Sequence, residues 1–181
     1  MTSPNWPTLL ASAQSSGAAL ASSVTKTSLL PANAKYLCPT VGFWYPGKKL
    51  RIRAKGVVST FTSGTLILAL DVGTVDAFAS QALTMVASQS NQTWWLDLEF
   101  RLLAIGAGGS ATANGFGVGN LCAGAAITAA TTLLPATSPG SAGTSFDPDL
   151  TTNVIDLVAT WSVNNAANSI QCVDYQLEAL N

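Results

Sequence analysis

Hydrophobic and polar residues alternate most regularly between residues 93 and 105. Asp97, Glu99 and Arg101 lie between apolar residues that recur at every second position. The apolar positions are Trp94, Leu96, Leu98, Phe100, Leu102 and Ala104. A helix would spread the three charges around its circumference, whereas a strand places them on one face. We therefore predict a long strand of an antiparallel sheet with one buried face, and a strongly specified register, because a slip of one residue would bury the charges.

The same alternation predicts further strands along the chain. The clearest are Leu50–Phe61, Thr65–Val72, Val154–Val163 and Ile170–Leu180, and the weaker candidates are Ala77–Ser88, Phe116–Leu121 and two proline-punctuated edge pieces at Thr27–Pro31 and Tyr36–Pro39. The tight turn at Ser63-Gly64 predicts that Leu50–Val72 forms a hairpin. Gly56 is expected to mark a bulge or a close packing contact. The glycines between 115 and 119 predict a strand whose backbone approaches a neighbour closely.

About eight strands, repeated turns and no convincing long helix predict an all-β fold. We expect an antiparallel β-sandwich of the jelly-roll type. Along Ile170–Leu180, Val173, Tyr175 and Leu177 are expected to face inward. The predicted core comprises Leu96, Leu98, Phe100, Ile155, Leu157, Trp161 and Tyr175.

Composition indicates association with other subunits. Only 9% of the 181 residues are charged, and residues 102–146 contain no charged residue. Such a chain forms one domain, and a surface this poor in charge favours association. The formal net charge of −1 gives no reason to expect a nucleic-acid partner. The longest uncharged apolar run, residues 121–134, is too short and too polar to span a membrane.

The first residues read as an arm rather than as part of the core. Residues 1–26 are rich in Ala and Ser and carry no charge before Lys26, whereas the strand pattern occupies residues 27–181. Ordering such a segment costs about 1–2 kcal/mol per residue in backbone entropy. We therefore expect the arm to be docked on a partner or back along its own domain. The start lacks the positive region of a signal peptide.

No metal or cofactor is expected. The sequence contains no His, and Cys38, Cys122 and Cys172 lie far apart, which removes the usual zinc clusters. These cysteines read as small buried hydrophobes, although a Cys38–Cys172 bridge stays open. Asp147-Pro148-Asp149 has oxygens for a calcium site, but Pro between two acids is first a turn signal.

Two motifs resemble enzyme sites without the context that those sites need. Asp97 and Glu99 are about 7 Å apart on one strand face, a spacing that suits the paired carboxylates of a glycosidase. Arg101 continues the row, however, as on a solvated strand face. Gly115-Phe116-Gly117-Val118-Gly119 resembles part of a glycine-rich nucleotide loop, but the following Lys and helix are missing. We expect no enzymatic activity.

A basic run and several aromatic residues are candidate binding elements. Residues 48–55 hold five of the eight basic residues, so they form either a solvated strand face or a contact with an acidic protein or a phosphate. Trp44, Tyr45 and Trp95 have the ring faces that stack on sugars. A carbohydrate-binding module therefore stays an alternative.

Three stretches resemble structural proteins of tailed bacteriophages. They are residues 45–56 (YPGKKLRIRAKG), residues 93–98 (TWWLDL), and the ending formed by 156–162 (DLVATWS), 168–171 (NSIQ) and 177–181 (LEALN). Their order and spacing cover nearly the whole chain beyond the arm. The chain thus looks like a virion protein of the capsid-decoration (cement) or minor capsid kind.

This resemblance implies a jelly-roll-like domain, no enzymatic activity and assembly on a particle. It implies the major capsid protein or another virion protein as partner, a homo-oligomer with a trimer favoured, and a place in the virion after assembly in the host cytoplasm. A tail-associated or receptor- or carbohydrate-binding module stays the alternative. The residues expected to contact partners are Trp6, Leu9, Leu10, Lys48, Lys49 and Phe116.

Overall fold

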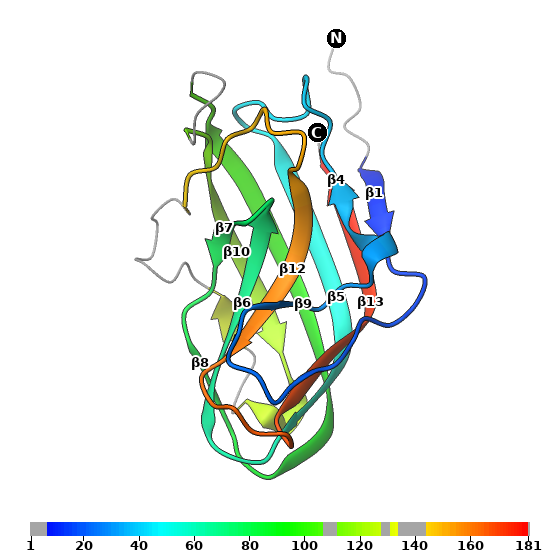
Figure 1. Ribbon diagram of the computed structural model, residues 1–181, viewed down its shortest axis with the longest axis vertical. Helices are drawn as coiled ribbons and strands as arrows, with labels where there is room; N and C mark the ends of the chain where they lie inside the picture. The colour runs from blue at the N-terminus through cyan, green and yellow to red at the C-terminus, as the bar shows by residue number, and fades with distance from the viewer. Residues whose placement is uncertain (1–6, 107–111, 128–130, 134–143, 181) are drawn as a thin grey trace.

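A computed structural model describes residues 7–106, 112–127, 131–133 (backbone) and 144–180. Two antiparallel sheets pack face to face as a β-sandwich, so the predicted all-β sandwich is confirmed. Figure 1 shows β12, β6 and β7 in front of β5 and β9. The jelly-roll type itself stays a prediction.

The larger sheet has seven strands, in the order β1-β13-β5-β9-β10-β11 with β2 also paired to β13. Their bounds are β1 Thr8–Ser12, β2 Leu20–Ala21, β5 Lys49–Thr60, β9 Gln89–Ala104, β10 Asn114–Cys122, β11 Thr131–Leu133 and β13 Ser169–Ala179. The predicted strand at residues 93–105 thus covers the last twelve residues of β9, the longest strand, which lies between β5 and β10.

The smaller sheet has six strands, in the order β3-β12-β6-β7 with β4 paired to β12 and β8 to β6. Their bounds are β3 Thr27–Ser28, β4 Tyr36–Leu37, β6 Gly64–Val72, β7 Val75–Ala79, β8 Leu83–Met85 and β12 Val154–Trp161. Two short 3-10 helices, Ala32–Ala34 and Gly124–Ala126, lie in connections. The two proline-punctuated pieces are β3 and β4, which both pair with the edge of β12 that lies away from β6, as the predicted edge strands.

The predicted core is confirmed. All seven of its residues are buried between the sheets, together with Trp94 and Leu102. Glu99 and Arg101 are exposed and Asp97 is half-buried on the opposite face. At the end of β9, Ala104 is exposed rather than inward, because the two sheets no longer cover the last residues of this long strand.

The predicted hairpin at Leu50–Val72 is wrong. β5 and β6 are joined by a tight turn, but they lie in different sheets and face each other across the core. β5 pairs instead with β9 and β13, and β6 with β12, β7 and β8. Alternation with a period of two shows which face of a strand is buried. It does not show whether the next strand pairs beside it in the same sheet or packs against it from the other sheet.

Gly56 marks both features that the sequence predicted. A Cβ at this position would lie 1.8 Å from the carbonyl oxygen of Gln171, so only a glycine fits there. The register of β13 against β5 shifts between Cys172 and Asp174, which is a bulge opposite Gly56. Val173 is the extra residue and is exposed, so its predicted inward position is wrong and Cys172 faces the core instead.

The glycines of β10 allow the close approach that was predicted. Gly115, Gly117 and Gly119 face inward, opposite Leu102, Phe100 and Leu98 of β9. A Cβ on Gly117 would lie 2.6 Å from Cδ2 of Phe78, which reaches across from β7 of the other sheet. This segment is therefore a strand that makes room for aromatic rings, and not a phosphate-binding loop.

Residues 8–21 lie along their own domain, which is one of the two places expected for the arm. β1 and β2 both pair with β13, and the backbone N–H of Gly17 donates to the carbonyl of Cys172. Leu20 is buried in the core. The pairing with β13 provides backbone hydrogen bonds that offset part of the ordering entropy.

Leu98→Ala is expected to lower the free energy of unfolding by about 2–5 kcal/mol, because it removes buried surface and leaves a cavity between the sheets. The neighbouring Glu99→Gln changes an exposed residue and should alter stability by less than about 0.5 kcal/mol. Chemical denaturation measures both. A cost for Leu98→Ala as small as that of its control would contradict the position of β9 in the core.

Cys38 and Cys172 are expected to be inert in the folded protein. Burial raises the pKa of each thiol to about 12, and the thiolate is the reactive form. Titration with a thiol reagent near pH 8 should therefore modify the half-buried Cys122 first, and all three cysteines after denaturation. Recovery of a single thiol in denaturant would instead reveal the Cys38–Cys172 bridge.

Candidate functional site

The outer face of the larger sheet collects most of the charge of this protein. Nine of the seventeen charged residues lie there, five basic and four acidic. They are Lys49, Arg51, Arg53 and Lys55 of β5, Asp97, Glu99 and Arg101 of β9, and Asp174 and Glu178 of β13. We call these nine residues the charged face. Alternation on three neighbouring strands puts them all on the same side.

Ion pairs link the strands of the charged face. The guanidinium of Arg51 donates two hydrogen bonds to the carboxylate of Asp97, one of them from Nε to Oδ1 at 2.9 Å. Lys49 Nζ lies 3.3 Å from Glu99 Oε1. The hydrogen bonds from Arg51 hold the pKa of Asp97 below its usual value. Asp97 is therefore a poor general acid, because that role requires a raised pKa.

A shallow hollow of about 320 Å³ lies on the charged face between β5, β9 and β10. Its polar lining residues are Arg51, Asp97, Glu99 and Asn120, and Val118 and Gly119 complete it. Trp95 lies on the same face of β9, two residues from Asp97, and is 43% exposed. Such a site can donate and accept hydrogen bonds and offers an aromatic ring nearby, as polar ligands require.

The loop after β4, the end of β9 and the loop before β12 meet at one end of the sandwich, the top in Figure 1. Each of these segments carries exposed apolar residues. We call this the apolar end; it comprises Leu37, Val41, Tyr45, Leu103 and Leu150. Backbone hydrogen bonds hold its loops together: the N–H of Gly47 donates to Leu102, and that of Cys38 to Asn153. These are five of the eleven exposed large hydrophobic residues in the part of the chain that the structure describes, and Val41 is 87% exposed.

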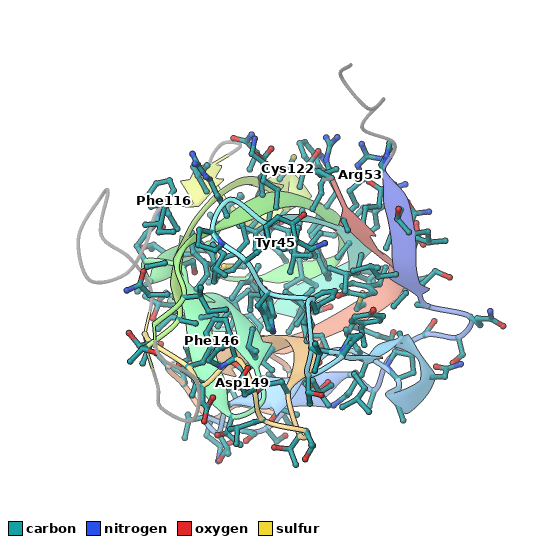
Figure 2. All side chains as sticks on the ribbon, turned by 90° about the horizontal axis from the view of Figure 1, so that it is seen from above. Tyr45, Arg53, Phe116, Cys122, Phe146 and Asp149 are labelled. Carbon is teal, nitrogen blue, oxygen red and sulfur yellow. The ribbon has the colours of Figure 1, made fainter. Side chains whose placement is uncertain are left out.

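An aromatic cluster supports the apolar end from below. The Trp44 ring packs edge-on against Phe43 and Phe146, with centroids 4.8 and 5.1 Å away. Lys48 is buried beside it, with Nζ 4.9 Å from the centroid of Phe43 and 5.4 Å from that of Tyr45. Burial lowers the pKa of Lys48. Figure 2, seen from above, shows how Tyr45, Phe146 and Asp149 are placed at this end.

The structure distributes the expected contact residues over several places. Leu9 of β1 is exposed beside Glu178, and Lys49 and the half-buried Phe116 lie on the same outer face of the larger sheet. Leu10 is the extra residue where the register of β1 shifts, and it packs against the core. Lys48 is buried at the apolar end, and Trp6 lies outside the described residues.

Two other candidate sites have ordinary structural roles, one as a solvated strand face and the other as a turn. The basic residues of 49–55 form a strand face whose charges are partly neutralised by neighbouring acids. Asp147-Pro148-Asp149 is a turn in which the N–H of Asp149 donates to the Asp147 carboxylate at 3.0 Å. Within the described ranges, no group of three or more His, Cys, Asp or Glu residues is placed to hold a metal ion.

A set of charges on the smaller sheet was not predicted from the sequence. Asp76, Asp71 and Asp156 lie side by side on β7, β6 and β12, with Lys26 and Lys35 beside them. A signal existed: Asp71 and Asp76 stand at equal distances from the Gly73-Thr74 turn, so a hairpin there brings them opposite each other.

A scan against protein-family models finds no match, and searches of curated proteins and of solved structures find no similar protein. No helix in the described part of the chain is long and apolar enough to cross a membrane.

Proposed function

We propose that this protein is a non-enzymatic structural subunit of a bacteriophage particle, which decorates or stabilises the capsid by docking its apolar end on the major capsid protein or another virion protein. Its place is then in the virion, after assembly in the host cytoplasm. The observation that carries the proposal is the apolar end, which presents five exposed large hydrophobic residues on fixed loops. Exposed apolar patches of this kind mark protein contact sites.

The construction of the apolar end supports a docking role. Its exposed side chains stand on loops that are fixed by backbone hydrogen bonds and by the aromatic cluster of Trp44 and Phe146. A preformed surface loses little conformational entropy on binding, so more of its buried area contributes to affinity. Charged residues border it in sequence, since Asp149 precedes Leu150 and Arg101 is two residues from Leu103, as a polar rim would.

The absence of enzymatic activity belongs to the same proposal. It is supported by the ion pair of Asp97, which lowers its pKa and so excludes this residue as the protonated acid that a glycosidase uses beside its second, ionised carboxylate. The jelly-roll type is supported by the strand order, because β5 passes to β6 and β12 to β13 across the sandwich, as in double-sheet jelly rolls. We further propose a homo-oligomer, with a trimer favoured by the family resemblance, and neither nucleic acid nor membrane as a partner.

Val41→Lys and Leu150→Lys are each expected to weaken binding to the particle by more than about tenfold, because a charge at the apolar end must be desolvated when the partner docks. Phe61→Lys is the matched control, since Phe61 is similarly exposed in the turn at the other end. Sedimentation of each variant with particles that lack this protein gives the measurement. Equal binding by all three variants would contradict docking through the apolar end.

The oligomer is tested separately. Light scattering on the purified protein should give a mass well above the 18.5 kDa of one chain, and three times that mass for the trimer. A monomer at micromolar concentration would contradict the proposed oligomer. The docking surface is tested independently, by the binding assay.

Carbohydrate binding is the second candidate function, and the hollow beside Trp95 is the observation that favours it. If it holds, Trp95→Ala should lower the affinity for fragments of the host's surface polysaccharide at least about tenfold, because a stacking ring is lost. Val173→Ala, which removes an exposed apolar side chain from β13, serves as the control. Calorimetric titration that detects no binding by the wild-type protein would remove this candidate.

A further inference from the structure

Three carboxyl groups form one row across the smaller sheet. In the register of the strands, Asp71 of β6 is the partner of Asp76 on β7 and of Asp156 on β12. Like charges directly opposite each other destabilise a sheet. Asp71 stands in the middle of this row and is only 5% exposed. A fully ionised row would therefore place three negative charges side by side, two of them, on Asp71 and Asp156, buried.

Two lysines from the segment that contains β3 and β4 act as counterions for this row. Lys26 Nζ lies 2.9 Å from Asp71 Oδ2 and 2.9 Å from Asp76 Oδ1. Lys35 Nζ lies 2.7 Å from Asp156 Oδ2, and the hydroxyl of Ser28 donates to the other oxygen of Asp156 at 2.8 Å. Two positive charges thus face three carboxyl groups.

One buried oxygen of the row has no hydrogen bond. Asp71 Oδ1 is buried and has no hydrogen bond, whereas both oxygens of Asp156 are paired. An ionised carboxylate in this position carries a large desolvation cost. A proton on Asp71 removes this cost and turns the group into a donor toward Asp76.

We propose that Asp71 and Asp76 share one proton at neutral pH and that loss of this proton loosens β7, an edge strand of the smaller sheet. The protonated Asp71 donates a hydrogen bond to the Asp76 carboxylate, and Lys26 balances the remaining charge. When the proton leaves, the two carboxylates repel each other across the β6–β7 pairing. The smaller sheet then has a pH-sensitive edge.

The electrostatics of the pair agree with this geometry. Burial, followed by the neighbouring Asp76, raises the pKa of Asp71 to about 7. Burial alone would raise the pKa of Asp76 as well, but its hydrogen bonds with Asp71 and Lys26 lower it below the usual value. Because the folded state holds the Asp71 proton more tightly than the unfolded chain, stability falls as pH rises from the ordinary aspartate value of about 4 through about 7.

A loosening of β7 would also change the packing of the larger sheet. The Phe78 ring of β7 packs against the backbone of β10, at Gly117, which belongs to the uncharged stretch of residues 102–146. Since this ring crosses the core, a shift of β7 changes the packing under β10. The proton on the carboxyl pair is thus coupled to both layers of the sandwich.

The direct test is a carbon-13 NMR titration of the aspartate side chains in the full chain. One carboxyl group of the pair should titrate near pH 7 and the other below the usual aspartate value. Lys26→Met should move the upper titration to higher pH, because it removes the cation that favours the ionised form. Titration of both Asp71 and Asp76 below about pH 5 would overturn the proposal.

The second test uses an isostere of the protonated acid. Asp71→Asn keeps a donor toward Asp76 but does not titrate, so its melting temperature should stay flat between about pH 5 and 8.5, where that of the wild type falls. Asp97→Asn, on the charged face, is the control and should keep the wild-type slope over this range. An unchanged slope in Asp71→Asn would contradict the shared proton, and the NMR titration of the wild type decides the matter if this variant does not fold.

Discussion

The pairing of β5 with β9 is the constraint on which the rest of the structure depends. On the inner side it places Leu50, Ile52 and Ala54 beside Phe100, Leu98 and Leu96, and on the outer side it places Arg51 and Arg53 opposite Glu99 and Asp97. A slip of one residue would bury the charges and expose the apolar side chains together. Hydrophobic burial and charge pairing therefore select the same register, and each surface ion pair contributes to specificity more than to stability.

Once β5 and β9 are fixed, the neighbouring strands follow from local fit. β13 lies on β5 with its Asp174 and Glu178 beside the basic row, and its bulge at Val173 adjusts it to the close contact at Gly56. β10 can lie on β9 because its inward glycines leave room for the rings of Phe100 and Phe78. Small residues on one strand and aromatic residues on its neighbours fill the same core volume.

The sequence predicted the faces of the strands better than it predicted their partners. Alternation was sufficient for the buried side of β9, β12 and β13, except where the bulge at Val173 reversed the order. It failed for β5 and β6, because adjacent strands in the chain can face each other across a core as well as within a sheet. The charges held the missing information: Arg51 and Arg53 on one strand match Asp97 and Glu99 on the other, which favours the β5–β9 pairing over the hairpin.

The candidate sites were less predictable, since they combine residues that only the fold brings together. The apolar end draws single exposed residues from the loops around Val41 and Leu150 and from the end of β9, and none of these stands out in its own segment. The row of Asp71, Asp76 and Asp156 likewise depends on the register of three strands. Its two lysines come from residues that were predicted partly as the N-terminal arm and partly as edge strands.

The distribution of charge connects these features. Nine of the seventeen charged residues lie on the charged face, so eight remain for the rest of the protein. Five of these eight are Lys26, Lys35 and the three aspartates of the carboxyl row. A chain that keeps so few charges outside its charged face does not place five together on the smaller sheet for solubility, because exposed and scattered charges would serve that purpose better. In this row the charges are partly buried and face one another. Their interactions therefore affect how firmly β7 and the segment that contains β3 and β4 are held to the rest of the smaller sheet. The smaller sheet, rather than the more regular larger one, is therefore the layer whose stability responds to pH.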